Sequence, residues 1–191
     1  MRSHFFAYVS RMRFIQRWAL MRNTAQENVQ EHSHQVAVLA HALAVIRNEK
    51  FCGSVDAGQV AVAALYHDAS EILTGDMPTP IIYDNPDIQN AYKEVEAVAE
   101  RKLLGLLPEE LQKVYAPIIT GQGGEIERLV KAADKLSAYI KCVEELKAGN
   151  NEFREAAAQT RKALEAYDLP EVQYFLETFM ESFSLTLDEL K

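Results

Sequence analysis

The chain has 191 residues, 48% of them hydrophobic, and a formal net charge of -8 at pH 7, so we expect one substantial core and a single domain over residues 1–191. The acidic balance argues against a nucleic-acid polymer as partner, because such binding needs a basic footprint on the phosphate backbone. No apolar run comes near the roughly 18 residues that a membrane-spanning helix needs, so we expect no membrane association. Cys52 and Cys142 form no CxxC pair and indicate no disulfide framework, so we expect a cytoplasmic location.

The first predicted helix, residues 3–16, belongs to a segment with the opposite charge. Residues 1–26 contain five arginines and no acidic residue. Three interpretations compete: a transit peptide, a basic helix face that pairs with acidic helices, or phosphate binding by one or two guanidinium groups, whose fork matches phosphate oxygens. Arg17, beside Trp18 near the expected end of the helix, is the candidate for phosphate binding.

Helical spacing of apolar residues continues along the rest of the chain, and no alternating strand pattern of useful length appears. Asn28 and Asp56 are suitable N-caps for the second and third helices. Gly75 ends the third helix, and the proline-rich segment 75–86 is expected to form a loop. The sequence therefore predicts an all-α array, with helices over residues 30–48, 57–73, 88–107, 126–147, 152–167 and 170–183 and a short helix with Pro108 in its first turn.

The third predicted helix contains three titratable residues where burial is expected. His67, Asp68 and Glu71 lie in "LYHDASEIL", and spacings of three and four residues place them toward one side of a helix. Buried carboxylates are normally paired or bound to a metal. His32, near the start of the second helix, and Asp134, within the apolar "LVKAADKLSAYI", are the candidate partners.

Two imidazoles and two carboxylates from three helices are a plausible ligand set for one divalent transition metal ion. Cobalt, manganese, iron and zinc all accept such ligands, and a six-coordinate ion would keep open positions for water and substrate. Such a site can hydrolyse an ester. The alternatives are structural: Asp134 could pair with Lys131 or Lys135, and the chain could be a helical interaction scaffold without a metal. We interpret three further histidines as ordinary surface or core residues: His4, His34 and His41.

The order of His32, the pair His67 and Asp68, and Asp134 resembles the HD-domain superfamily of metal-dependent phosphohydrolases. Longer stretches, "RNTAQENVQEHSHQVAVLAHALA", "ALYHDASEILTGDMPTP" and "LVKAADKLSAYIKCVEELKAGNNEF", are similar to the bacterial 5′-deoxynucleotidases of that superfamily, over nearly the whole chain. The resemblance implies an HD-domain helical array with the metal site between central helices. It also implies a homodimer that hydrolyses deoxyribonucleoside 5′-monophosphates to deoxyribonucleosides and phosphate.

The resemblance also implies roles for individual residues. His32, His67, Asp68 and Asp134 match the metal ligands of the family. Arg17, Glu71 and Asp76 match residues of its phosphate and catalytic site, and Trp18 matches a residue of sugar selection.

Within this scheme Glu71 would activate the attacking water, and Asp76 would contact the substrate and protonate the departing 5′ oxygen, although the two roles could be exchanged. Trp18 could form a wall against the 2′-hydroxyl of ribose, or could simply pack. Two other functions fit the same motif: a cyclic-nucleotide phosphodiesterase, and a module that binds a nucleotide without turning it over.

Overall fold

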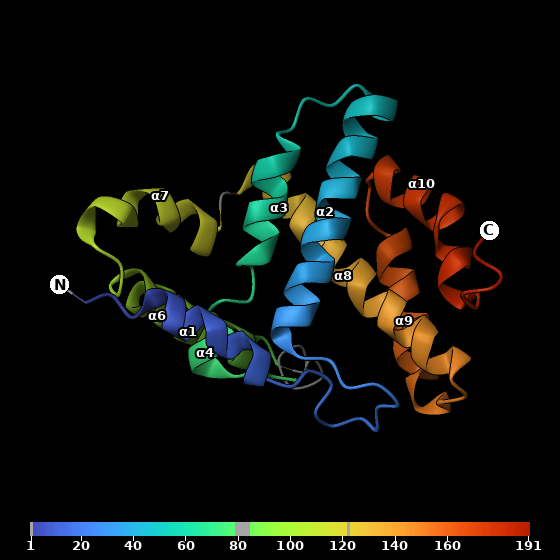
Figure 1. The fold of residues 1–191 in the computed structure, drawn as a ribbon, viewed down its shortest axis with the longest axis horizontal. Coiled ribbons are helices and arrows are strands. Elements are labelled where there is room, and N and C mark those ends of the chain that lie inside the picture. The colour runs from blue at the N-terminus through green and yellow to red at the C-terminus, as the bar shows by residue number, and fades with distance from the viewer. Residues whose placement is uncertain (1, 79–84, 122) are drawn as a thin grey trace.

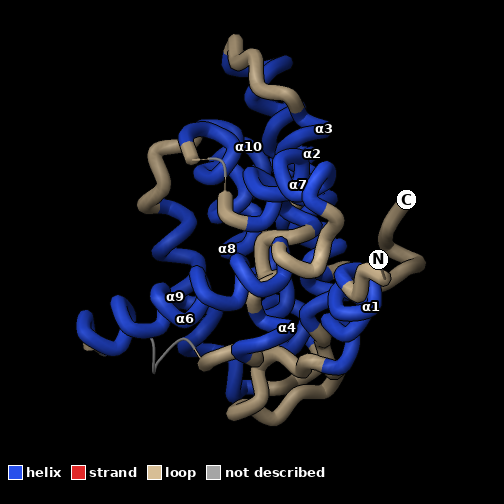
Figure 2. The backbone as a smooth tube through the Cα atoms, turned by 90° about the vertical axis from the view of Figure 1, so that its left-hand side faces the viewer, coloured by secondary structure: helices blue, strands red, loops and turns tan. Residues whose placement is uncertain are grey.

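A computed structural model of the chain describes residues 2–78, 85–121 and 123–191. In these ranges the regular structure is helical and has no named strand (Figures 1 and 2). The one isolated β-bridge among the described residues joins Gln16 to Asn28. The all-α prediction is confirmed. The α-helices are α1 (Phe5–Val9), α2 (Val29–Phe51), α3 (Ala57–Leu65), α4 (Glu71–Thr74), α6 (Pro86–Leu104), α7 (Glu109–Ile119), α8 (Gly124–Lys147), α9 (Arg154–Glu165) and α10 (Pro170–Thr178), and the 3-10 helices are η1 (Ser10–Phe14), η2 (Asn151–Phe153) and η3 (Met180–Ser184).

The main core surrounds α2, which lies at the centre of the array with α3 and α10 beside it and α8 crossing it (Figure 1). Leu43 of α2 and Leu136 of α8 have no exposed surface. A second, smaller core joins the N-terminal helix to α6 and α7 through Phe5, Leu103 and Ile119. The turn after α3 contributes Ala69 to this second core, so that turn lies between the two clusters.

The predicted N-caps are confirmed at α2 and α3. The Asn28 side chain accepts from the backbone N–H of Glu31, and the Glu31 side chain accepts from the Asn28 N–H, which together form a capping box. Asp56 accepts from the N–H of Gln59 at the start of α3. The capping box fixes where α2 begins, and therefore places His32 in its first turn.

The predicted helix over residues 57–73 is wrong, because the chain breaks it in two. α3 ends at Leu65, residues 66–70 form a turn, and α4 begins at Glu71. The N–H groups of Ala69 and Glu71 bond to carbonyls three residues earlier, not four. Ala69 is 1% exposed in the second core. Packing of Ala69 against that core turns the chain away from the axis of α3, and apolar spacing cannot report such a turn.

Two other predicted segments differ in detail. The helix expected over residues 3–16 is α1 followed by the tighter η1, and it ends at Phe14. Of the predicted loop 75–86, residues 75–78 and 85 are not helical, residues 79–84 lie outside the described residues, and Pro86 already belongs to α6.

The C-terminal aromatic residues separate into core and surface positions. Phe175 is 6% exposed and belongs to the main core, whereas Phe179 is 42% exposed. Among the described residues, no helix has the length and apolar character needed to cross a membrane.

Candidate metal centre

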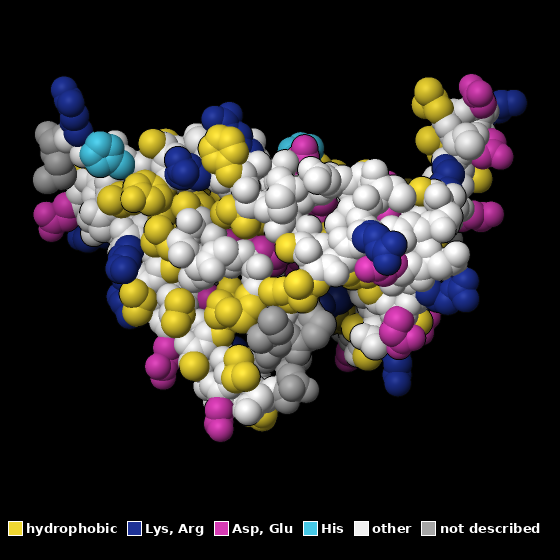
Figure 3. All heavy atoms as spheres, turned by 90° about the horizontal axis from the view of Figure 1, so that it is seen from below, with side chains coloured by type: hydrophobic (Ala, Val, Ile, Leu, Met, Phe, Trp, Pro, Cys, Tyr) yellow, Lys and Arg dark blue, Asp and Glu magenta, His cyan; other side chains and the backbone are white. Residues whose placement is uncertain are grey.

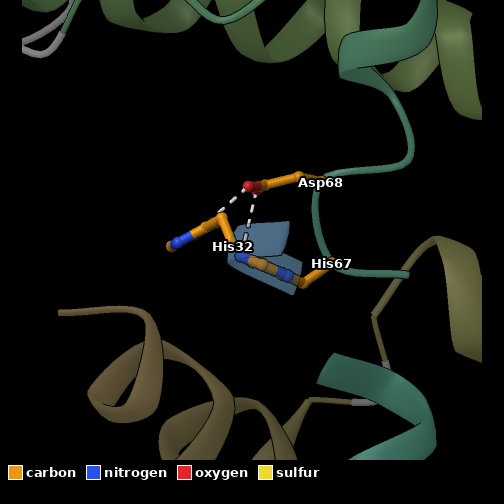
Figure 4. A group of neighbouring side chains, drawn as sticks. All are labelled: His32, His67 and Asp68. Atoms are coloured by element: carbon orange, nitrogen blue, oxygen red, sulfur yellow. Dashed lines mark ion pairs between the residues drawn. The ribbon is translucent and has the colours of Figure 1, made fainter. Parts of the chain in front are cut away.

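Three elements bring together the four residues with metal-ligand chemistry. His32 comes from the first turn of α2, His67 and Asp68 come from the turn between α3 and α4, and Asp134 comes from α8. The His32 and His67 rings have centroids 5.3 Å apart, and Figure 4 shows the Asp68 carboxylate facing both rings. One potential ligand atom from each of these three residues lies within 4.8 Å of the other two.

Each carboxylate approaches both imidazoles at their Nε2 atoms. Asp68 Oδ1 is 3.2 Å from His67 Nε2, and Asp68 Oδ2 is 3.5 Å from His32 Nε2. Asp134 Oδ1 is 3.1 Å from His32 Nε2 and 3.9 Å from His67 Nε2. His32, His67 and Asp68 thus form the compact group, and Asp134 joins it through its contacts with the two imidazoles.

The hydrogen bonds behind the two rings determine which nitrogen faces this point with a lone pair. His67 Nδ1 lies 2.8 Å from the carbonyl oxygen of Ala64, which can only accept, so Nδ1 carries the hydrogen. His32 Nδ1 lies 3.2 Å from the hydroxyl of Ser137, and that hydroxyl donates to Gln35 Oε1 at 2.7 Å. Ser137 therefore accepts from His32 Nδ1–H. With the hydrogen on Nδ1, Nε2 of His67 is an acceptor without a partner, whereas Nε2 of His32 lies 3.1 Å from Asp134 Oδ1 and would offer its lone pair to a cation bound between them.

Acceptor atoms without a hydrogen-bond partner indicate that this group of side chains could bind a cation. Within the described part of the chain, His67 Nε2 and Glu71 Oε2 are buried without a hydrogen-bond partner. A buried acceptor that faces carboxylate oxygens is unfavourable, and a metal ion bound between them removes that cost. Nitrogen and oxygen donors suit first-row divalent metals.

Arg17 lies at the edge of this centre. Its Nη1 is 3.4 Å from Asp68 Oδ2, and its Nε is 3.3 Å from Glu27 Oε2. Burial alone would lower the pKa of the guanidinium, but Asp68, Asp134 and Glu27 raise it above its ordinary value. Arg17 therefore stays charged beside the predicted metal ligands, which is the position expected for a phosphate-binding residue.

Other arginines of the N-terminal segment have other roles. Arg22, whose side chain is 95% exposed, pairs with Glu152 beyond the end of α8. Arg11 and Arg13 lie over the ring of Phe14. Arg22 thus pairs with an acidic residue of another element but lies outside any helix, and Arg17 pairs with acidic residues at the candidate metal centre.

Glu71 is the first residue of α4, and Asp76 follows its C-cap, Gly75. Burial raises the pKa of Glu71 to about 10, and the charges of Asp68 and Asp76 act in the same direction. Burial also raises the pKa of Asp76, and Asp68 adds to the effect while Arg17 opposes it. Both carboxyl groups therefore belong to the electrostatic environment of the centre.

Two hydrogen bonds hold the segment between Glu71 and Asp76 in place at Gly75. Gly75 adopts a φ of 75°, in the left-handed region that favours glycine. Its carbonyl accepts hydrogen bonds from Thr74 Oγ1 at 3.1 Å and from the Tyr92 hydroxyl of α6 at 3.3 Å. These bonds fix the start of the segment that carries Asp76.

The balance of charge also favours a bound cation. Five carboxyl groups, those of Glu27, Asp68, Glu71, Asp76 and Asp134, act on the single guanidinium of Arg17 or on each other. Burial alone would raise the pKa of Asp134, but its contact with His32 lowers it, and the fields of His67 and Arg17 act in the same direction. Figure 3 shows acidic side chains near the middle of the lower face, with hydrophobic side chains around them. A divalent ion would neutralise this excess of acid groups.

Trp18 has an unusual backbone conformation. Its φ is 57°, in the left-handed region that costs a non-glycine residue roughly 1 kcal/mol or more. Its ring packs against Phe153 with centroids 5.3 Å apart, and its Nε1–H donates to Glu27 Oε2 at 2.9 Å. Trp18 therefore packs, as the alternative interpretation held, and also makes a polar contact that it shares with Arg17.

Three residues of this environment were missed in the sequence analysis. Ser137 follows Asp134 by three residues, and Gln35 follows His32 by three, so helical spacing could have identified both as residues behind the ligands. Glu27 gives no comparable signal. It contacts residues nine and ten positions earlier in an irregular segment, where no periodicity relates them.

Comparisons with known proteins show which family the chain is similar to. The family model described as 5′-deoxynucleotidase YfbR-like matches residues 4–183. A 5′-deoxynucleotidase of Photobacterium profundum is 53% identical over 191 residues, which cover 99% of this chain and 98% of that protein. The 5′-deoxynucleotidase YfbR of Escherichia coli O1:K1 is 54% identical over 190 residues, which cover 98% of this chain and 96% of that protein.

Solved structures share the fold at lower identity. An HD-domain phosphohydrolase from Listeria innocua matches with a TM-score of 0.83 and 22% identity, over 94% of this chain and 88% of that one. The HD phosphohydrolase DatZ of cyanophage S-2L, bound to dA and one catalytic Zn²⁺ ion, matches with a TM-score of 0.62 and 22% identity, over 93% and 95% of the two chains. The array of helices is thus the HD-domain fold, with the candidate metal centre between its central helices.

Proposed function

This chain belongs to the YfbR-like family of 5′-deoxynucleotidases, and on that premise we propose that His32, His67, Asp68 and Asp134 bind its divalent metal ion. The protein is a metal-dependent 5′-deoxynucleotidase, which hydrolyses deoxyribonucleoside 5′-monophosphates. The observation that carries the proposed ligand set is the approach of two imidazole Nε2 atoms to two carboxylates. Cobalt, manganese, iron and zinc all fit these donors.

The surrounding side chains divide the remaining tasks. When bound, the cation supplies Lewis acidity toward water and toward a phosphate oxygen. Arg17 neutralises charge on the other phosphate oxygens, since its guanidinium is held at the edge of the ligand set. Glu71, at the start of α4 beside Asp68, takes the proton of the attacking water, and the charge of a bound cation would oppose the burial that raises its pKa and hold the ionised form that this role requires. Asp76 protonates the departing 5′ oxygen.

We assign the choice between deoxyribose and ribose to Trp18. A large aromatic side chain next to the phosphate-binding arginine can close on the 2′ edge of the sugar. Its one hydrogen-bond donor, Nε1–H, is already used by Glu27, so it offers the extra hydroxyl of ribose no partner. The name that the two relatives share supports a deoxynucleotidase over a cyclic-nucleotide phosphodiesterase or a module without turnover.

Replacing Trp18 with alanine should lower the preference for deoxyadenosine over adenosine 5′-monophosphate by about tenfold or more, because the wall beside the 2′ carbon is removed. The measurement is kcat/KM for phosphate release from both substrates, by metal-stripped protein resupplied with cobalt or manganese. Phe14→Ala is the matched control, because Phe14 is an exposed aromatic residue of the same segment. An unchanged preference in Trp18→Ala would refute the selective role. Absence of metal-dependent release from the wild-type protein would refute the function itself.

Replacing Ser137 with alanine should weaken metal binding by roughly 10- to 100-fold, because His32 then loses the hydroxyl that fixes its tautomer. Titration calorimetry of the metal-stripped protein with manganese or cobalt measures this. Ser33→Ala is the control, since Ser33 is a buried serine of α2 whose hydroxyl has no partner among the described residues. Equal affinities of the two variants would contradict the role of Ser137.

We also propose that the enzyme is a cytoplasmic homodimer. Several large apolar side chains are open on neighbouring helices: Val38 of α2 is 57% exposed, Val62 of α3 40% and Val114 of α7 61%. Val62 and Val114 line a shallow hollow of about 440 Å³ between α3 and α7, which a second copy could cover. The single domain over residues 1–191 stays a prediction.

A further inference from the structure

The segment between η1 and α2 places Arg17 opposite Glu27. The N–H of Arg17 donates to the carbonyl of Glu27 at 2.9 Å, and the N–H of Val29 donates to the carbonyl of Ile15 at 2.9 Å. Gln16 and Asn28 form an antiparallel bridge between these two bonds. The backbone register therefore sets the side chains of Arg17 and Glu27 beside each other, as it does for facing residues of paired strands.

A single oxygen of Glu27 binds two functional residues. Glu27 Oε2 accepts from Arg17 Nε at 3.3 Å and from Trp18 Nε1 at 2.9 Å. The carboxylate is 13% exposed and Arg17 is 14% exposed, so water screens this contact weakly. Because Glu27 occupies Nε, the terminal nitrogens of the guanidinium point away from it, and Nη1 faces Asp68.

The same contact fixes the orientation of Trp18. The ring lies against Phe153, which alone would let it turn or slide. The bond from Nε1–H to Glu27 fixes one edge of the ring, and the backbone stays in the left-handed region. Glu27 thus sets the position of Trp18 relative to Arg17.

The rest of this segment is held without Glu27. The buried Glu145 of α8 accepts from the backbone N–H groups of Thr24 and Ala25 and from the Thr24 hydroxyl. Lys141, also buried, pairs with Glu145 and donates to the carbonyl of Ala25. These contacts anchor the far end of the segment to α8, so a conservative change at Glu27 should leave its fold in place.

We propose that Glu27 is a positioning residue that couples phosphate binding to sugar selection, because its one oxygen holds both the Arg17 guanidinium and the Trp18 ring. The coupling rests on the proposed roles of Arg17 and Trp18. Among the described residues, the side chain of Glu27 bonds to Arg17 and Trp18 and to none of the proposed metal ligands. It acts through the two side chains that it orients.

The test is Glu27→Gln, which keeps the shape and removes the charge. We expect kcat for deoxyadenosine 5′-monophosphate to fall about tenfold, and the preference over adenosine 5′-monophosphate to fall by a similar factor, the size expected for one hydrogen bond to a charged group. Trp18 is the sole tryptophan of the chain, so intrinsic fluorescence reports its environment directly. Its emission should shift, and acrylamide quenching should increase.

Two comparisons separate positioning from a general structural effect. Glu152→Gln is the matched control, because Glu152 accepts from the N–H of Arg22 in the same segment but bonds to neither Arg17 nor Trp18. This variant should change neither the substrate preference nor the Trp18 emission. In a Trp18→Phe background, which already lacks the indole N–H, Glu27→Gln should still lower kcat but should change the preference no further.

The outcomes keep this inference distinct from the proposed function. An unchanged emission and preference in Glu27→Gln would overturn the positioning role. A shifted emission with an unchanged preference would also overturn it, provided that Trp18→Ala loses the preference. If Trp18→Ala keeps the preference, the proposed sugar selection fails first, and Glu27 then has no selective role to transmit.

Discussion

Replacing Asp68 with asparagine should abolish metal binding and lower phosphate release by about a thousandfold or more. Asp68 contacts His32, His67 and Arg17, so its carboxylate serves both the cation and the phosphate-binding residue. Lewis acidity of a bound ion contributes several kcal/mol to such a reaction, and each 1.4 kcal/mol or so corresponds to a factor of ten. Calorimetric titration with manganese and a phosphate-release assay measure the two losses.

Thermal unfolding distinguishes this loss from misfolding. Metal that binds only the native state raises the melting temperature of the wild-type protein, and Asp68→Asn should lose that increase while the metal-free melting temperature changes little. Asp87→Asn, at an exposed carboxylate in the first turn of α6, is the control and should keep both binding and turnover. If Asp68→Asn still bound the metal with wild-type affinity, the proposed ligand set would be wrong.

Replacing Glu71 with glutamine should keep the metal and lower kcat by about 10²- to 10⁴-fold, the range for removal of a general base. Glutamine has nearly the same shape as glutamate, so α4 should keep its conformation, but the amide cannot take a proton. Glu94→Gln, at an exposed position of α6, is the control. Full activity of Glu71→Gln, with metal bound, would contradict the assigned role. Asp76 would then be assigned the role of general base.

The same variant should also change how stability depends on pH in the metal-free protein. The pKa of Glu71 is raised from 4.5 to about 10, first by burial and then by Asp68 and Asp76. The folded chain therefore binds more protons than the unfolded chain between these values, so the free energy of unfolding decreases as pH rises toward 10. Glutamine mimics the protonated side chain and should reduce this decrease. Urea unfolding at pH 6 and pH 9 measures the effect, and an equal slope in both proteins would contradict it.

The fold was largely predictable because helical periodicity and cap residues are local signals. Asn28 and Asp56 begin α2 and α3 as expected, and α8 follows its apolar pattern closely. The break at Tyr66 was not predictable in this way. Its cause is the burial of Ala69 in a second core built by Phe5 and Leu103, which lie far away in the sequence.

The candidate site was predictable at positions where a titratable side chain interrupts an apolar stretch of sequence. His67, Asp68 and Asp134 are titratable residues in apolar surroundings, and the structure places them together with His32. Glu27 belongs to a different class, since it lies in an irregular polar connector where an acidic residue is unremarkable. Its role depends on a backbone pairing between residues 15–17 and 27–29, which no short-range pattern encodes.

The turn between α3 and α4 has a consequence for protein engineering. Within a continuous helix, His67 and Asp68 would project about 100° apart around the axis, at opposite margins of one face. The turn at residues 66–70 releases them from that constraint. Substitutions that favour helix through these positions would strengthen local structure while separating the two side chains. At this point of the chain, a more regular and more stable backbone would make a poorer enzyme.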